Sequence, residues 1–290
     1  MPELPEVEVL VRHLAASLPG ARVIGVEVLR PKVVRPDSVQ RFRRALLGAR
    51  FTRIARRGKY LVFTLRPANK RREFPLLGHL GMTGRMFLQA AGEAIPRHAA
   101  VVLHLGRTDF IYQDTRYFGR MTLDPSALDD LGPEPLGTGF TPEAFALALG
   151  RSAQPIKVKL LDQAVVAGIG NIYASEALFR GRISPRRSAR RLKPEAVRRL
   201  WRAIRTTLGE AVEWGSTVPL NWSGAGKPDG LFYYGQAVSA PTGYGERLAV
   251  YDRAGKHCLR CGRPIRRIVQ AARSTFYCPT CQRDDAGLRA

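Results

Sequence analysis

The chain is poor in acidic residues and in lysine. Of its 290 residues, 24 are acidic and 47 are basic, and only eight of the basic residues are lysine, which leaves 39 arginines. The resulting net charge of +23 at pH 7 indicates a polyanionic partner, because arginine binds phosphates bidentately and stacks on bases. A proteome that is rich in arginine throughout is the alternative explanation for this charge.

Long apolar runs are also missing. No stretch approaches the ~18 apolar residues that a membrane-spanning helix needs, which argues against an integral membrane protein. The first residues are acidic and lack the basic and apolar regions of a signal peptide, so we expect a cytoplasmic protein. Hydrophobic residues nevertheless make up 45% of the chain, and its length suffices for two globular domains.

Cysteine is scarce and confined to one short segment. The chain has four cysteines, and sixteen residues separate two C-x2-C pairs, Cys258/Cys261 and Cys278/Cys281. This spacing argues against a disulfide framework and predicts one structural Zn²⁺ held by four thiolates. Because all four positions are thiolates, the ion has no open site for water and supports the fold. Four arginines lie in or next to the intervening segment and could contact phosphates: Arg263, Arg266, Arg267 and Arg273.

Hydrophobic periodicity separates a β-rich half from a helical half. Residues 3–18 have helical spacing, and four short β-rich runs follow: Val23–Leu29, Tyr60–Leu65, Val101–Leu105 and Phe110–Tyr112. Residues 106–109 read as a hairpin turn between the last two runs. A segment rich in proline and glycine precedes four predicted helices, at 141–149, 156–166, 172–180 and 194–214. Residues 215–247 read as a long loop.

The first six residues, Met-Pro-Glu-Leu-Pro-Glu, allow two interpretations. Proline and glutamate are ordinary in the first turn of a helix, where N–H groups lack partners and negative charge is favoured. If Met1 is removed, however, Pro2 presents a secondary amine that can attack a sugar aldehyde carbon. Glu3 then places a carboxylate beside that amine to carry protons.

Several separated motifs together resemble one family. They are Met1–Glu8, Arg57-Gly58-Lys59-Tyr60, His79–Gly84, Asp114–Gly119, Ile156-Lys157, Gly168–Glu176 and Arg273–Cys278. The chain is similar in these motifs to the bacterial formamidopyrimidine-DNA glycosylases, also called 8-oxoguanine DNA glycosylases. The resemblance extends over nearly the whole chain.

The resemblance implies an activity and a catalytic set. It implies a bifunctional glycosylase and abasic-site (AP) lyase that removes oxidised purines through a Schiff base and successive β- and δ-elimination. Pro2 matches the nucleophile, Glu3 the general acid/base and Lys59 the catalytic lysine near the lesion phosphate. Glu6 matches a further acid that lines the site. Outside the resemblance, Lys59 would read as a surface lysine at a strand edge.

The same resemblance implies residues that hold DNA around a flipped base. Residues that fill the gap or contact the strand match His79, Met82, Arg116 and Phe118, and phosphate ligands match Lys157, Asn171 and Arg273. The alternatives are core packing for Met82 and Phe118, a satisfied histidine for His79, and a helix cap for Asn171. Gly168-Ile169-Gly170 ahead of a helix predicts exposed backbone N–H groups for a phosphate.

The implied fold is α+β with two domains. An N-terminal antiparallel β-sandwich with an N-terminal helix spans residues 1–130, and a linker spans 131–142. A helix–two-turn–helix domain at 143–250 carries a lesion-covering loop near 216–247, and a zinc-binding β-hairpin spans 251–290. We expect a monomer that binds damaged double-stranded DNA and no membrane.

Two departures and two alternatives accompany the resemblance. Tyr117 stands where a polar or basic residue is expected, and the 216–247 segment is unusually rich in glycine, proline and tyrosine, which leaves the base preference open. An endonuclease VIII-like enzyme for oxidised pyrimidines is one alternative, although Leu4 argues against it because that type usually has glycine there. A non-catalytic, zinc-containing DNA-binding protein is the other.

Overall fold

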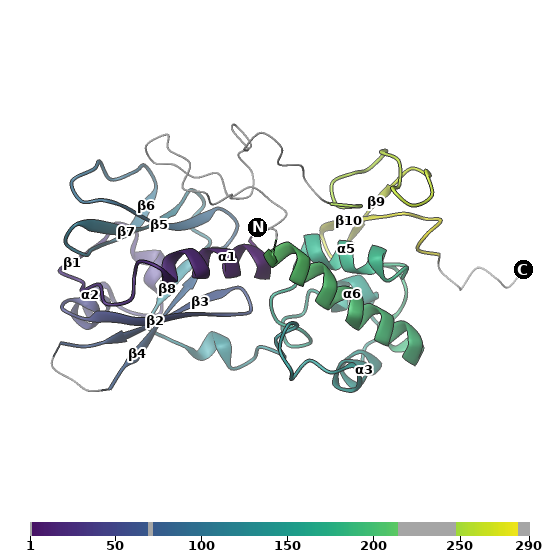
Figure 1. Ribbon diagram of the computed structural model, residues 1–290, viewed down its shortest axis with the longest axis horizontal. Helices are drawn as coiled ribbons and strands as arrows, with labels where there is room; N and C mark the ends of the chain where they lie inside the picture. Colours follow the sequence, from purple (N-terminus) through teal and green to yellow (C-terminus); the bar gives the residue numbers. More distant parts are fainter. Residues whose placement is uncertain (1, 69–71, 214–247, 284–290) are drawn as a thin grey trace, which may run out of the picture. The chain divides into compact units, whose positions relative to one another are not determined.

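The computed structural model of the protein describes residues 2–68, 72–213 and 248–283 (Figure 1). These residues form two compact units, one that ends at Asp129 and one that begins at Asp130. None of the described helices is long and apolar enough to cross a membrane.

Two antiparallel four-stranded sheets form the first unit (Figure 1). One sheet has the order β1-β6-β7-β5, with strands at Gly25–Val28, Ala99–His104, Thr108–Asp114 and Gly84–Ala90. The other has the order β2-β3-β4-β8, with strands at Arg50–Arg57, Tyr60–Arg66, Phe74–His79 and Arg120–Thr122. The Phe63 ring of β3 lies 5.6 Å from the Phe110 ring of β7, so side chains of the two sheets share one core. The predicted β-sandwich is confirmed.

Two helices pack on this sandwich, and short 3₁₀ turns lie at Pro31–Val34 and Ser126–Leu128. Helix α1 (Leu4–Ala15) buries Val7, Leu10, Val11 and Leu14, because these apolar residues recur on one helical face. It ends three residues before the predicted 18, because the Ala16 and Ser17 N–H groups bond the His13 and Leu14 carbonyls in tighter turns, at 3.3 and 3.1 Å. Helix α2 (Val39–Leu46) was not predicted; the Ser38 hydroxyl caps it by accepting the Arg41 N–H at 3.1 Å.

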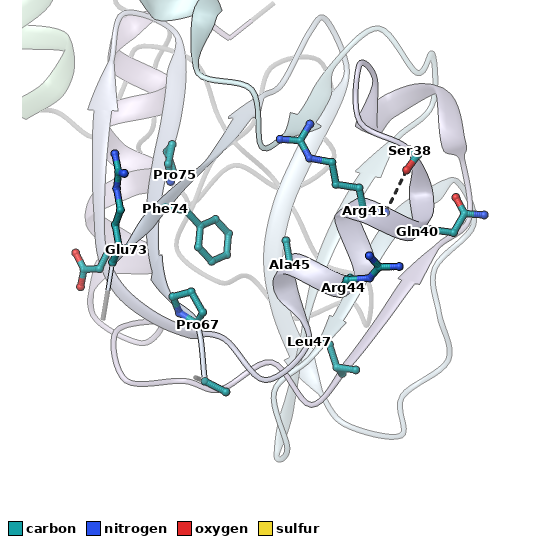
Figure 2. Close-up of a pocket in the computed structure, with 12 residues that line it drawn as sticks. Ser38, Gln40, Arg41, Arg44, Ala45, Leu47, Pro67, Glu73, Phe74 and Pro75 are labelled. Carbon is teal, nitrogen blue, oxygen red and sulfur yellow. Dashed lines mark hydrogen bonds between the residues drawn. The ribbon is translucent and has the colours of Figure 1, made fainter. Parts of the chain in front are cut away.

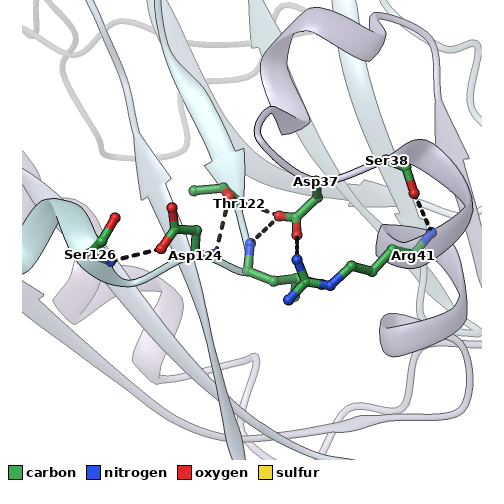
Figure 3. Close-up of polar contacts among 7 residues, drawn as sticks. Asp37, Ser38, Arg41, Thr122, Asp124 and Ser126 are labelled. Carbon is green, nitrogen blue, oxygen red and sulfur yellow. Dashed lines mark hydrogen bonds and ion pairs between the residues drawn. The ribbon is translucent and has the colours of Figure 1, made fainter.

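A buried carboxylate ties the start of α2 to the end of β8 (Figure 3). The Asp37 side chain accepts the Thr122 hydroxyl at 2.8 Å and the Leu123 N–H at 2.7 Å, and it pairs with the Arg41 guanidinium at 2.8 Å. The Asp37 side chain is fully buried, whereas that of Arg41 is 65% exposed. The two bonds to Thr122 and Leu123 therefore matter more for stability than the ion pair.

Asp37→Ala is expected to lower the free energy of unfolding by about 2–4 kcal/mol. The Thr122 hydroxyl and the Leu123 amide would each lose an acceptor, at about 1–3 kcal/mol per unsatisfied group. Arg41→Ala is the comparison variant and should cost less, about 1–2 kcal/mol, because it leaves only one oxygen of the buried Asp37 carboxylate without its cation. Urea denaturation of both variants measures the difference, and equal losses would contradict this ranking.

The second unit combines helices with one β-hairpin. Its helices are α3 (Pro142–Gly150), α4 (Ile156–Lys159), α5 (Asn171–Arg180) and α6 (Pro194–Glu213), with a 3₁₀ turn at Ala189–Arg191. Strands β9 (Arg266–Gln270) and β10 (Arg273–Tyr277) pair antiparallel, and β10 packs against α5. Phe179 of α5 shares a small core with Val250, Ile265 and Phe276, so helix and hairpin are packed as one body.

Several predicted elements differ from the structure. The predicted helix 156–166 is wrong after Lys159, because side chains compete for the backbone: Asp162 accepts the Ala164 N–H at 3.0 Å, and Gln163 donates to the carbonyls of Leu161 and Ile169. The predicted hairpin turn at 106–109 is shorter, since Thr108 already belongs to β7. Strands β2, β4, β5 and β8 were not predicted. The predicted loop at 215–247 lies outside the described residues.

Candidate active site and nucleic-acid-binding surface

The N-terminal helix start buries two carboxylates beside Pro2. Glu3 is the N-cap of α1, and its side chain accepts the Glu6 N–H, while the Glu6 carboxylate accepts the Glu3 N–H at 2.7 Å. This reciprocal capping box confirms the ordinary helix-start interpretation of both glutamates. It also fixes the chain at the positive end of the helix dipole, where residue 2 lies. Glu3 and Glu6 are 1% and 0% exposed, so both carboxylates lie in a desolvated setting.

Lys59 occupies the tight turn between β2 and β3. Arg57 pairs with Tyr60 across the ladder, and Gly58 between them has a φ of 55°, a backbone conformation that glycine adopts at little cost. Arg56 donates to the Gly58 carbonyl at 3.1 Å and to Glu8 of α1 at 2.8 Å. The turn with Lys59 is thereby linked to the helix that begins beside Pro2. Sequence reasoning missed this link.

Glu8 serves as the anchor of that link. Burial raises the pKa of Glu8, but hydrogen bonds and charge from Arg56 and Arg12 outweigh it and hold the pKa below its ordinary value. The Arg56 side chain is only 9% exposed, whereas that of Arg12 is 61% exposed. The partly buried pair with Arg56 is therefore the one that fixes the Lys59 turn against α1.

His79 stands next to Lys59 because Tyr60 and His79 are opposite each other in the β3–β4 ladder. Burial, with the charges of Lys59 and Arg120, lowers the pKa of His79 to about 4. The ring is therefore neutral at pH 7. Its Nδ1 accepts the Gly81 N–H at 3.2 Å, so the proton is on Nε2, which is left as a hydrogen-bond donor.

The neutral His79 predicts an acid-sensitive first unit. The folded pKa lies below the ordinary 6.5, so the unfolded chain binds the proton first as pH falls. We expect stability to decrease as pH falls from about 6.5 toward 4, and His79→Gln to reduce that decrease. The urea midpoints of the unmodified protein and of His79→Gln, measured between about pH 6.5 and 4, test this expectation. Parallel pH profiles would show that His79 makes no contribution.

Met82, Arg116 and Phe118 form one exposed cluster on two adjacent loops. Met82 is 42% exposed and Phe118 is 53% exposed, so the core-packing alternative is wrong for both. The Arg116 guanidinium donates to the Met82 sulfur at 3.4 Å and lies 4.6 Å from the centre of the Phe118 ring. A cation stacked between a thioether and an aromatic ring suits insertion between bases.

Asp114 organises these two loops and was not identified from the sequence. One carboxylate oxygen accepts the Thr83 hydroxyl at 2.6 Å and the Arg116 N–H at 3.1 Å. The other accepts the Gly119 N–H at 2.8 Å and the Tyr112 hydroxyl at 3.3 Å. Asp114 itself is 0% exposed. A single buried carboxylate thus holds the Met82 turn and the Arg116–Phe118 loop together.

Close backbone packing explains two glycines in these loops. Gly81 has a φ of 58°, and a Cβ there would lie 2.5 Å from the Gly119 nitrogen. A Cβ on Gly119 would lie 2.2 Å from the Tyr112 hydroxyl oxygen. Tyr117, the unexpected residue of this segment, has a φ of 51° and lies against Arg30 and His98. Its side chain therefore has a packing role.

Asp114→Asn is expected to loosen both loops. The amide nitrogen cannot accept a hydrogen bond, so at least one of the Arg116 and Gly119 N–H groups loses its partner, and its hydrogen exchange should rise about tenfold or more. Asp109→Asn is the matched control, because Asp109 is a buried carboxylate of β7 that bonds His104 instead. Hydrogen exchange of residues 81–84 and 115–119, measured by mass spectrometry, tests this expectation. Equal increases in both variants would contradict the role of Asp114.

In the second unit, Lys157 and Asn171 are brought together. The Lys157 ammonium donates to the Asn171 side-chain oxygen, and the Asn171 amide nitrogen donates to the Ser274 carbonyl at 2.9 Å. Gly170, and not Asn171, is the N-cap of α5, so the cap interpretation of Asn171 is wrong. Asn171 instead connects three elements. It lies in α5, accepts from Lys157 of α4 and donates to Ser274 of β10, which is the neighbour of Arg273.

Two further expectations for this region have different outcomes. The predicted exposed N–H groups at Gly168–Gly170 are not seen, because all three residues are buried and the Gly168 N–H donates to Gln163 at 2.9 Å. Arg273 lies at the start of β10 beside the Ala271-Ala272 turn and is exposed. Its guanidinium forms no hydrogen bond or ion pair with any other described residue. Arg273 is thus available to an external anion.

The four cysteines fit one zinc ion. Their sulfur atoms all lie within 4.8 Å of one another, with Cys258–Cys281 at 3.9 Å and Cys261–Cys278 at 3.5 Å. A tetrahedral Zn²⁺ with Zn–S bonds of ~2.3 Å requires sulfur separations of about 3.8 Å. Backbone N–H groups of Arg260 and Cys281 donate to Cys258 and Cys278 sulfurs at 3.4 Å, which stabilises thiolates. The predicted structural zinc site is confirmed.

The zinc module is docked on both ends of α5. Arg260 donates to the Phe179 carbonyl at 2.8 Å and stacks 4.4 Å from the Phe179 ring centre, at the C-terminal end. The Gln282 amide donates to the Ile183 carbonyl at 2.9 Å nearby. At the N-terminal end, Asn171 contacts Ser274 as described. Metal binding and the position of α5 are therefore connected through direct hydrogen bonds.

The β-sandwich with an N-terminal helix, joined to a helical unit with a four-cysteine hairpin, defines a class of zinc-containing, nucleic-acid-binding proteins. Three family models match the chain: the formamidopyrimidine-DNA glycosylase N-terminal domain at residues 1–121, the helix–two-turn–helix domain of that family at 131–220, and the zinc finger found in these enzymes and in isoleucyl-tRNA synthetases at 255–283. The chain belongs to the formamidopyrimidine-DNA glycosylase family.

Individual relatives agree with this assignment. The formamidopyrimidine-DNA glycosylase of Pelotomaculum thermopropionicum is 42% identical, over 98% of this chain and 99% of the relative. That of Thermus thermophilus is also 42% identical, over 97% and 98%. A solved structure of the Lactococcus lactis enzyme with DNA containing N7-benzyl-Fapy-dG superposes with a TM-score of 0.84 at 31% identity, covering 98% of this chain and all of that one.

Proposed function

We propose that the protein is a bifunctional DNA glycosylase and AP lyase that excises oxidised purines, such as 8-oxoguanine and formamidopyrimidines, from duplex DNA. Family membership supports the glycosylase activity. Solved relatives are complexes with DNA containing Fapy-dG, carbocyclic 8-oxo-G or an abasic site. The observation that carries the proposal is the start of α1, where Pro2 precedes a buried Glu3 at the positive end of a helix.

Pro2 supplies the nucleophile in this proposal. Once Met1 is removed, its secondary amine has an ordinary pKa near ~8, well below the ~10.4 of lysine, so more of it is neutral at pH 7. The helix dipole disfavours its cation further. The nitrogen attacks C1′ of the damaged nucleotide, the C1′–N bond to the base breaks, and the base leaves with a proton. Ring opening then gives an iminium between Pro2 and the sugar.

Strand cleavage follows from the iminium. Removal of a C2′ proton expels the 3′ phosphate in β-elimination, and a second proton loss expels the 5′ phosphate in δ-elimination. Glu3 is the group that carries these protons, because it is the carboxylate adjacent to Pro2. Lys59 and the Nε2–H of the neutral His79 are donors for phosphates beside the lesion. Glu6 lines the site while it completes the cap of Glu3.

The remaining predicted residues hold the DNA in this proposal. Met82, Arg116 and Phe118 occupy the space that the flipped nucleotide vacates, which fits their exposure and mutual contact. Lys157, Asn171 and Arg273 bind phosphates of the damaged strand, and binding should weaken steeply with salt. A monomer that acts on DNA in the bacterial cytoplasm completes the proposal.

Incision of lesion-containing duplexes tests the proposal. We expect cleavage of 8-oxoguanine duplexes to exceed that of thymine glycol duplexes, and borohydride to trap a covalent adduct with abasic DNA. Faster cleavage of thymine glycol would favour the endonuclease VIII-like alternative. Binding without incision or adduct, by a chain that mass spectrometry shows to begin at Pro2, would favour the non-catalytic alternative.

A further inference from the structure

We propose that the groove between α2 and the adjoining ends of β3 and β4 in the first unit docks an acidic peptide segment of a partner protein. The groove encloses about 900 Å³, a size that accommodates a few peptide residues (Figure 2). α2 forms one wall, and the ends of β3 and β4 form the other. Its apolar part holds Ala45, Leu47, Pro67, Ala68, Phe74 and Pro75.

The apolar floor suits an inserted side chain. The Phe74 ring projects from β4 toward α2 in Figure 2, and Pro67 lies beside it. Leu47, directly after α2, is 59% exposed at the rim, next to the apolar floor. An aromatic or aliphatic side chain from a partner would cover Leu47 and the Phe74 face and remove both from water.

The rim of the groove is mostly cationic, with three arginines and one glutamate. Arg41 pairs with Asp37 at 2.8 Å, and Glu73 pairs with Arg66 at 3.0 Å. Arg44 and Arg72 also line the groove, and neither forms an ion pair with a residue in the part of the chain that the structure describes. The Arg44 and Arg72 guanidinium groups around an apolar floor are complementary to carboxylates that flank an apolar residue.

The position of the groove favours a peptide over the DNA substrate. β3 and β4 have Lys59 and His79 at one end, and Pro67 and Phe74 at the other. The seven residues of β3 span about 20 Å at ~3.3 Å per residue. Duplex DNA offers phosphates to Arg44 and Arg72 but no apolar side chain for the floor. A peptide in the groove would leave the Lys59 end of the sheet uncovered, so binding and incision can coexist.

Fluorescence anisotropy of the full chain tests the docking site. The probe is a labelled peptide of aspartate and glutamate with one central phenylalanine, and the comparison peptide has serine in place of phenylalanine. The groove variants are Leu47→Ser and the double variant Arg44→Ser/Arg72→Ser. Matched controls are Ile24→Ser, which is also 59% exposed but lies outside the groove, and Arg43→Ser, an exposed arginine of α2 that does not line it.

We expect each groove variant, and the serine peptide, to weaken binding about tenfold or more. Both controls should stay within about twofold, and an excess of unlabelled abasic duplex should leave the peptide bound. Incision by the groove variants should be unchanged. Equal weakening by Arg43→Ser, or no preference for the phenylalanine peptide, would contradict the proposal. Peptide binding would then be nonspecific electrostatic attraction to a chain of charge +23. Displacement by the duplex would place the peptide on the DNA surface and overturn the proposal.

Discussion

A chain that retains Met1, or that has a short N-terminal extension, is expected to lose covalent capture of abasic DNA by about 10³-fold or more, the range seen when a covalent nucleophile is removed. In such a chain the nitrogen of residue 2 belongs to an amide, and its lone pair is delocalised into the carbonyl. It cannot attack C1′. The buried carboxylates of Glu3 and Glu6 would remain, so only the nucleophile changes.

Binding measured in parallel separates chemistry from folding. The blocked chain should bind an abasic duplex within about threefold of the processed chain, because the other residues proposed to contact DNA are unaltered. Borohydride trapping followed by peptide mapping should place the adduct on Pro2 in the processed chain. Adduct formation at an equal rate in the blocked chain would remove Pro2 from the mechanism and point to a lysine amine, of which Lys59 is the first to test.

Features with short-range signals could be predicted from the sequence. The two C-x2-C pairs predict a tetrahedral thiolate site because each pair lies within one turn, and the four sulfurs do converge. Helix α1 follows from its apolar period. In each case a few neighbouring residues contain the whole signal.

Features that depend on distant contacts could not be predicted. Asp114 bonds Thr83, which is 31 residues earlier, and Asp37 bonds Thr122, which is 85 residues later. A single sequence gives no information on which carboxylate faces which hydroxyl after folding. The link from Glu8 through Arg56 to the Lys59 turn could not be predicted from the sequence for the same reason. Asp114 and Glu8 nevertheless position groups that the motifs identify, the Arg116–Phe118 loop and the Lys59 turn.

Removal of zinc is expected to uncouple the hairpin from α5 and to weaken duplex binding by about 100-fold. Structural zinc contributes about 10–16 kcal/mol of binding free energy in small modules, far more than the small core around Phe276 can replace. Without the ion, no bond holds the four sulfurs together, and β9–β10 should lose its order. Asn171 then loses its bond to Ser274, and Arg260 no longer caps the Phe179 carbonyl. Cys278→Ser should reproduce the effect, because Cys278 is the fully buried ligand.

Gln282→Ala tests whether the effect acts through α5. Gln282 is no ligand, but it accepts the Cys278 N–H at 2.9 Å and donates to the Ile183 carbonyl at 2.9 Å. We expect this variant to retain one zinc per chain by metal analysis and still to bind duplex about tenfold more weakly, at a cost of about 1–2 kcal/mol for two buried hydrogen bonds. Added zinc should rescue the chelated protein and leave the variant unchanged. Normal duplex binding by Gln282→Ala would show that the contact between the zinc module and α5 does not affect DNA binding. The loss of binding on zinc removal would then arise from Arg273 and the hairpin alone.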